Sequence, residues 1–145
     1  MNLTYLICYI LIILYSFSRN QNLSSEAKSK YQPPGYVFGI VWPILYFFIG
    51  LNILFLEKNL SLLLLVQSLV NISWIPVFQN KMYLSSFLLI LLMIILILPI
   101  ILISHDKIRF LLIFYVAWLS FAGFLNYDIY TNRKVKTITN IKTKY

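Results

Sequence analysis

Long apolar stretches, separated by short clusters of charged and turn-forming residues, dominate this chain. Five such stretches can be marked off, at about residues 3–17, 37–56, 60–78, 83–103 and 108–130. A bilayer core about 30 Å thick needs about 20 helical residues at a rise of 1.5 Å per residue. The last four stretches meet this length, and the first is shorter. Spanning segments of this kind must be helices, because lipid offers no partners to exposed backbone groups.

Composition supports the membrane interpretation. Hydrophobic residues make up 61% of the 145 residues and charged residues 11%, against roughly 45–50% and 25% in ordinary soluble domains. So few charges could not cover a water-exposed surface. The predicted fold class is therefore all-α, a five-transmembrane-helix bundle in an integral membrane protein. The membrane domain is expected over residues 1–131, followed by a basic tail over residues 132–145 that is expected to be poorly ordered.

The first stretch is short enough to be a secretory signal peptide instead of a membrane helix. It lacks a basic leader before the apolar run and an A-x-A-like cleavage site. A retained first helix is therefore the preferred interpretation.

The distribution of basic residues predicts the topology. Stretches two to five are joined by only a few residues each, so successive helices should be antiparallel neighbours. Five crossings place the termini on opposite sides, and the positive-inside bias predicts a cytoplasmic C-terminus and first loop. The basic residues of that side are Arg19, Lys28, Lys30, Lys81, Arg133, Lys134, Lys136, Lys142 and Lys144. A mitochondrial outer membrane, the endoplasmic reticulum and a bacterial-type envelope all fit this multi-pass protein.

The net charge of +8 does not indicate a nucleic-acid partner. The basic residues lie in the tail or between apolar runs, whereas a nucleic-acid reader needs a basic face with stacking aromatics. The lipid bilayer is the expected partner, and the tail could help to hold an anionic leaflet.

No catalytic constellation is evident, so no catalytic residue is predicted and the chain is not expected to be an enzyme. His105 shares a short polar loop only with Asp106, and the four acidic residues form no pair within a helix. Cys8 is the only cysteine and lies in an apolar run, so neither a disulfide nor a thiolate metal cluster is expected.

Polar residues inside apolar helices are costly and tend to face the bundle interior. Gln67, Asn71 and Trp74 follow the spacing i, i+4, i+7, which places them on one helical face, and Phe78 extends that face by about one turn. These amides could hydrogen-bond to neighbouring helices or contact a ligand, and both interpretations stay open.

The fifth stretch carries a second one-sided stripe, formed by Leu111, Tyr115, Trp118, Ala122 and Asn126. Its small residues admit either a close helix or a flat ligand. Asp128, near the helix end, is expected to reach the interface or to pair with a cation of the tail. Together with Trp42 and Trp74, Trp118 could line an apolar cavity with a few polar groups, the usual composition of a small-molecule site.

Three segments resemble signature segments of the tryptophan-rich sensory protein/translocator protein family. Pro33–Tyr46 is similar to its PPGWxFGxxWxxLY segment, Gln67–Phe78 to QLxLNxxWxPxFF, and Tyr115–Tyr127 to PYLxWxxFAxxLNY. They occur in the family's order and on the corresponding helices. The resemblance covers most of the chain after Lys30.

The resemblance implies a five-helix bundle, often homodimeric, whose ligand cavity opens toward the first loop. It also implies porphyrin binding, and in animal members cholesterol and synthetic ligands. No obligatory cofactor is implied; a porphyrin or haem-like molecule would be a ligand. Residues at matching positions would line or support the cavity, namely Trp42, Tyr46, Asn71, Trp74, Phe78, Trp118, Ala122 and Asn126. Tyr31 would lie in the lid loop.

The chain departs from the family pattern at several positions. Tyr31, Tyr36 and Tyr130 stand where many members have tryptophan, Thr131 occupies a usual arginine position, and the acid of the fourth helix is missing. The expected function is binding, sensing or transport of porphyrin-like tetrapyrroles, with sterols as secondary ligands. The alternatives are a photo-oxidative, tetrapyrrole-degrading enzyme and a non-catalytic partner subunit of a membrane complex.

Overall fold

The computed structural model describes residues 3–19 and 28–142. Within these ranges the chain forms five α-helices and no strand: α1 (Leu3–Arg19), α2 (Gly35–Phe55), α3 (Lys58–Gln79), α4 (Tyr83–Ile103) and α5 (Asp106–Lys142). Helices α2, α3 and α4 and the Arg109–Val135 part of α5 are long and apolar enough to span a membrane, and α1 contributes a shorter apolar helix. The predicted all-α membrane bundle is confirmed.

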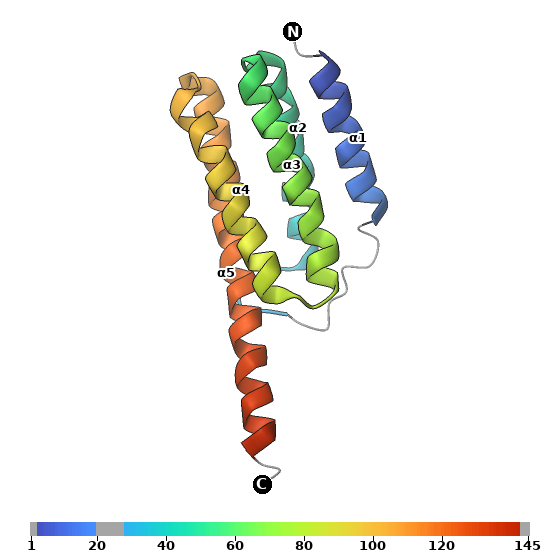
Figure 1. The fold of residues 1–145 in the computed structure, drawn as a ribbon, viewed down its shortest axis with the longest axis vertical. Coiled ribbons are helices and arrows are strands. Elements are labelled where there is room, and N and C mark those ends of the chain that lie inside the picture. The colour runs from blue at the N-terminus through green and yellow to red at the C-terminus, as the bar shows by residue number, and fades with distance from the viewer. Residues whose placement is uncertain (1–2, 20–27, 143–145) are drawn as a thin grey trace.

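The helices run alternately up and down, so the two chain ends lie at opposite ends of the bundle (Figure 1). Helix α1 packs against α2 and α3, α2 also packs against α5, and α4 packs against both α5 and α3. The helices therefore close a ring in the order α1, α2, α5, α4, α3, with a further α2–α3 contact across it. Segments far apart in sequence, such as α2 and α5, thereby become neighbours.

Most helix bounds lie within a few residues of the predicted ones. Helix α4 has the predicted bounds, whereas α3 begins at Lys58 rather than Leu60 because a first helical turn tolerates polar residues. Pro43, Pro76 and Pro99 lie inside α2, α3 and α4. Membrane helices tolerate such prolines where neighbouring groups satisfy the freed backbone atoms.

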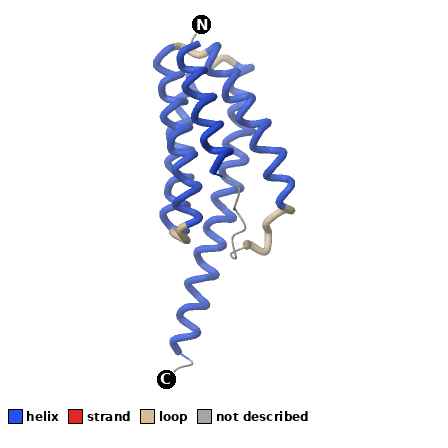
Figure 2. Tube along the Cα trace, turned by 90° about the vertical axis from the view of Figure 1, so that its right-hand side faces the viewer, coloured by secondary structure: helices blue, strands red, loops and turns tan. Residues whose placement is uncertain are grey.

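Helix α5 is the main departure from the sequence-based expectation. It continues to Lys142, although the fifth helix was expected over 108–130 and the tail over 132–145 was expected to be poorly ordered. No glycine or proline follows Gly123 in α5, so nothing in the backbone chemistry ends the helix near Tyr130. Figures 1 and 2 show α5 extending well past the other four helices.

Buried and exposed apolar residues divide between the inside and the outside of the ring. Ile53, Leu64, Ile97 and Leu119 are fully buried in one core cluster to which all five helices contribute. Large apolar side chains are also exposed along the outer faces of the helices, among them Leu102 at 76%. A water-soluble monomer rarely exposes so much contiguous apolar surface, and lipid contact accounts for it.

Candidate functional site

A buried hydrogen-bonded network joins four helices at the centre of the bundle. Tyr115 Oη of α5 accepts hydrogen bonds from Gln67 Nε2 at 2.6 Å and Asn71 Nδ2 at 2.8 Å, both on α3. Tyr46 of α2 donates its hydroxyl to Asn71 Oδ1 at 3.0 Å. Tyr9 of α1 donates to the Tyr46 carbonyl at 2.8 Å. Both amides on the predicted α3 face are therefore used in holding helices together.

The Gln67 amide cannot use both of its polar atoms in this network. The side chain is fully buried, and Gln67 Oε1 has no hydrogen-bond partner among the described residues. Rotating the amide by 180° would let Oε1 accept the Tyr115 proton but would leave Nε2 unpaired instead. In either orientation Gln67 retains one polar atom that a ligand could satisfy.

Aromatic rings of α2 and α5 form a continuous group beside the polar network. The Trp42 ring stacks against Tyr46 with centroids 5.4 Å apart and meets Trp118 edge-on at 6.4 Å. The ring centroids of Phe38 and Trp118 lie 5.5 Å apart. Ala122 packs against the same core cluster as the two tryptophans. Three residues predicted for the ligand site, Trp42, Tyr46 and Trp118, are thus brought together.

Two indole N–H groups are buried without an acceptor in the described part of the chain. Nε1 of Trp74 and Nε1 of Trp118 are inaccessible and unpaired. Both side chains are partly buried against the same core cluster. An unpaired buried donor costs about 1–3 kcal/mol, so a bound molecule that supplied an acceptor would be favoured here.

Phe78 and Asn126 occupy a different part of the bundle, against α4. The Trp74 and Phe78 rings stack at 5.0 Å, and Phe78 meets Tyr83 edge-on at 5.4 Å. Asn126 Oδ1 accepts a hydrogen bond from Ser86 Oγ at 3.0 Å, whereas Asn126 Nδ2 is buried and unpaired. These two residues therefore support α3–α4–α5 packing, and Trp74 connects them to the central core.

The described end of the first loop, residues 28–34, is hydrogen-bonded to α5. The buried Ser29 hydroxyl donates to Asp128 Oδ2 at 2.6 Å and accepts a hydrogen bond from the Tyr31 N–H at 3.2 Å. The ring centroids of Tyr31 and Phe124 lie 5.3 Å apart. Asp128, for which the sequence suggests the interface or a tail cation, thus bonds to the loop. Tyr31 is 51% exposed, as a residue of a lid over the bundle end would be.

The outer edge of this loop carries a positive charge. Lys30 Nζ lies 4.7 Å from the centroid of the Tyr31 ring. A side-chain hydrogen bond with Tyr31 raises the pKa of the fully exposed Lys30 ammonium. The group is therefore cationic at neutral pH.

Replacing Ser29 with alanine is expected to loosen the first loop. The change removes the bond to Asp128 and the acceptor of the Tyr31 N–H, and a hydrogen bond to a charged group contributes about 1.5–3 kcal/mol. Hydrogen exchange at the Tyr31 amide should become roughly tenfold faster or more. Ser73→Ala is the control, because the Ser73 hydroxyl bonds only within α3, to the Leu69 carbonyl. Equal exchange at Tyr31 in both variants would contradict a fastened loop.

Several residues of this region are absent from the sequence-based site. Tyr115 belongs to the predicted α5 stripe, and its burial could have been anticipated from that position. Phe38 lies within the Pro33–Tyr46 segment, and this position could have identified it as a candidate site residue. Ser29 and Ser86 give no such signal, because their partners lie 99 and 40 residues away in sequence. Within the described residues, no group of three or more His, Cys, Asp or Glu side chains could hold a metal ion.

Comparison with known proteins places this bundle in a family. No curated individual protein matches the chain. The model of the TspO/MBR family matches residues 4–131, from the beginning of α1 to the part of α5 that carries Trp118 and Asn126. The match covers most of the chain and includes all three segments whose motifs resemble that family. The chain therefore belongs to the TspO/MBR family.

Proposed function

We propose that this protein binds a porphyrin-like tetrapyrrole between its helices, as a binding, sensing or transport protein. Membership of the TspO/MBR family supports a membrane role in tetrapyrrole or sterol binding or transport in general terms, and favours binding over catalysis. The observation that carries the proposal is the pair of buried, unpaired indole N–H groups of Trp74 and Trp118 beside an aromatic group.

A porphyrin matches these features chemically. Its flat macrocycle can stack on aromatic rings such as those of Trp42 and Trp118, and offset or edge-on aromatic pairs contribute about 0.5–1.5 kcal/mol beyond their buried area. Its carboxylate substituents are acceptors that the indole N–H groups of Trp74 and Trp118 could satisfy. Lys30, at the loop edge, would attract an anionic ligand as it approaches the bundle. A sterol has one hydroxyl and no extended aromatic face, so these residues favour the tetrapyrrole.

The basic residues at the bundle end that carries the C-terminus support a cytoplasmic orientation of that end. Lys28, Lys30 and Lys81 lie in the first loop and the α3–α4 connection, and α5 leaves the bundle on the same side (Figure 1). By the positive-inside bias this end would face the cytoplasm. A ligand admitted beneath the first loop would then enter from the cytoplasmic side.

Replacing Trp118 or Trp74 with phenylalanine is expected to weaken protoporphyrin binding about tenfold. Each change keeps an aromatic ring but removes an N–H donor, and a hydrogen bond to a charged acceptor contributes about 1.5–3 kcal/mol. The dissociation constant is measured by titrating purified protein in detergent and following the porphyrin absorbance. Trp42→Phe is the matched control, because it keeps a ring that can stack and its Nε1 is not among the buried unpaired donors.

The possible outcomes distinguish an error in the location of the site from an error in the class of ligand. Saturable binding that weakens in Trp74→Phe and Trp118→Phe but not in Trp42→Phe supports the proposal. Saturable binding unchanged in all three variants would move the site elsewhere. Linear, non-saturating changes in absorbance would exclude a porphyrin site in the bundle. Intrinsic fluorescence gives a second readout, since the chain contains only these three tryptophans.

A further inference from the structure

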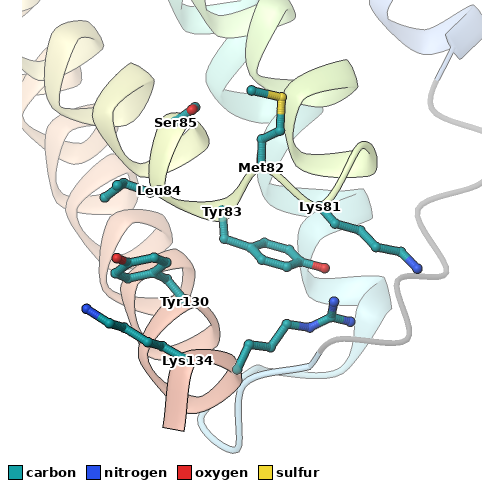
Figure 3. A pocket seen from close by; sticks show the side chains of 8 residues that line it. Lys81, Met82, Tyr83, Leu84, Ser85, Tyr130 and Lys134 are labelled. Carbon is teal, nitrogen blue, oxygen red and sulfur yellow. The ribbon is translucent and has the colours of Figure 1, made fainter. Parts of the chain in front are cut away.

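A pocket lies outside the helix bundle core, where the α3–α4 connection meets α5. This open pocket has a volume of about 380 Å³ and is lined by Lys81, Met82, Tyr83, Leu84, Ser85, Tyr130, Arg133 and Lys134. Figure 3 shows Lys81 and Tyr83 coming from the connection and the start of α4, with Tyr130 and Lys134 on α5. Its volume falls within the usual range of small-molecule sites, about 300–1,000 Å³. None of its residues belongs to the tetrapyrrole site.

The charged residues among the described lining of this pocket are all cationic. Lys81, Arg133 and Lys134 contribute three cationic groups, and no acidic side chain is among its described lining residues. The Arg133 guanidinium carbon lies 4.9 Å from the centroid of the Tyr83 ring, a cation–π contact that orients it. Asp128, the acid of this part of α5, is hydrogen-bonded to Ser29 of the first loop. The pocket therefore has the chemistry of an anion site.

The backbone at Lys81 adopts a left-handed conformation that costs a residue other than glycine free energy. The Lys81 N–H donates to the Phe78 carbonyl and the Met82 N–H donates to the Val77 carbonyl, the hydrogen-bond pattern that ends α3 in a Schellman motif. Lys81 has a φ of 62°, and this left-handed position usually holds glycine, because other residues lose roughly 1–2 kcal/mol there. The structure thus has a lysine where the backbone favours glycine.

The pocket is continuous with an apolar stripe on the outside of α4. Leu84 lines the pocket, and Leu88, Leu91 and Ile95 follow it at steps of four, three and four residues, which keep one helical face. All four side chains are at least 40% exposed. Because α4 is a candidate membrane span beginning at Tyr83, the stripe faces lipid and the pocket lies at its interfacial end. An anionic group and an apolar chain could therefore bind as one molecule.

We propose that this pocket binds the phosphate-bearing headgroup of an anionic phospholipid, whose acyl chains lie along the α4 stripe. Basic pockets between membrane helices are suited to such headgroups. Lys81, Arg133 and Lys134 contact the phosphate, and Ser85 and the tyrosine hydroxyls are within the same pocket as hydrogen-bonding groups. The proposal uses residues separate from the tetrapyrrole site, so either proposal can fail without the other.

Native mass spectrometry of the full-length protein in detergent tests the proposal, with dioleoyl phosphatidylglycerol as the probe. The protein should retain phosphatidylglycerol in preference to dioleoyl phosphatidylcholine. Arg133→Gln combined with Lys134→Gln should weaken phosphatidylglycerol binding roughly 30-fold, from about fivefold for each cation near an anionic headgroup. The matched control is Lys58→Gln with Lys107→Gln, which removes the same charge at the opposite end of the bundle and should leave binding unchanged.

The variant Lys81→Gly distinguishes the loss of a positive charge from a loss of folding stability. Glycine relieves the left-handed backbone, so the free energy of unfolding should stay the same or rise, while phosphatidylglycerol binding should fall about fivefold. This variant tests the pocket even if the double variant on α5 folds poorly.

Three results would overturn the proposal. Equal losses in the two double variants would indicate nonspecific attraction to the net charge. Equal retention of phosphatidylcholine would show that the anionic headgroup is not recognised. Displacement of phosphatidylglycerol by an equal concentration of glycerol 1-phosphate would assign the pocket to a water-soluble phosphorylated ligand. The expected result is that glycerol 1-phosphate does not compete and that protoporphyrin binding is unchanged in all of these variants.

Discussion

Replacing Gly50 with leucine is expected to lower the free energy of unfolding by about 3 kcal/mol and to detach α1 from the bundle. A Cβ atom at Gly50 would lie 3.2 Å from Tyr9 Cε1 and 3.7 Å from Leu6 Cδ1, so α1 and α2 approach one another closely at this position. A leucine has to displace the Tyr9 ring, which also donates its hydroxyl to the Tyr46 carbonyl. Small residues allow such close contacts between membrane helices.

The unfolding of protein in mixed detergent micelles, followed by helix content, measures this effect. Gly39→Leu is the control in the same helix, because a Cβ at Gly39 would meet nothing within 4 Å. That variant should be neutral or slightly stabilised, since leucine forms helices better than glycine by roughly 1 kcal/mol. Similar behaviour of the two variants would show that α1 is not held by close packing at Gly50.

Tyr115→Phe is expected to lower the free energy of unfolding by about 2–4 kcal/mol, the second large effect. The change keeps the ring but removes the hydroxyl that accepts hydrogen bonds from Gln67 and Asn71. Both amides would remain buried with an unpaired N–H, each costing about 1–3 kcal/mol. The same unfolding measurement applies.

Tyr127→Phe is the matched control for that prediction, because Tyr127 lies on the same helix and is 49% exposed. Its stability should change by less than about 0.5 kcal/mol. A double-mutant cycle with Asn71→Leu adds a sharper test, since residues sharing one hydrogen bond should be coupled by about 0.5–3 kcal/mol. Additive effects would mean that the Asn71–Tyr115 bond does not contribute to stability.

Features that depend on the spacing of residues along one helix could be predicted from the sequence. The i, i+4 spacing of Gln67 and Asn71 predicted a shared face, and the structure aims both amides at one tyrosine. Helix α4 has the predicted bounds because Lys81 and the Ser104–Asp106 segment interrupt the apolar pattern on either side. The predicted end of the fifth helix at residue 130 is wrong, because α5 continues to Lys142 and no glycine or proline follows Gly123 in this helix.

Contacts between distant segments could not be predicted from this one chain. The Ser29–Asp128 bond joins residues 99 positions apart, and no periodicity connects a loop serine to an aspartate near a helix end. Trp42 and Trp118 could be singled out individually, but their edge-on contact depends on α2 lying beside α5 in the ring. The positive φ of Lys81 is equally hidden, because lysine gives no signal for a left-handed position.

Helix α5 is longer than a bilayer core is thick. Its 37 residues span about 55 Å at 1.5 Å per residue, against about 30 Å for the bilayer core. Trp118, within the aromatic group, and Lys142, at the far end, belong to one uninterrupted helix. If the proposed ligand binds beside Trp118, a turn or tilt of α5 would therefore move its C-terminal end outside the bilayer.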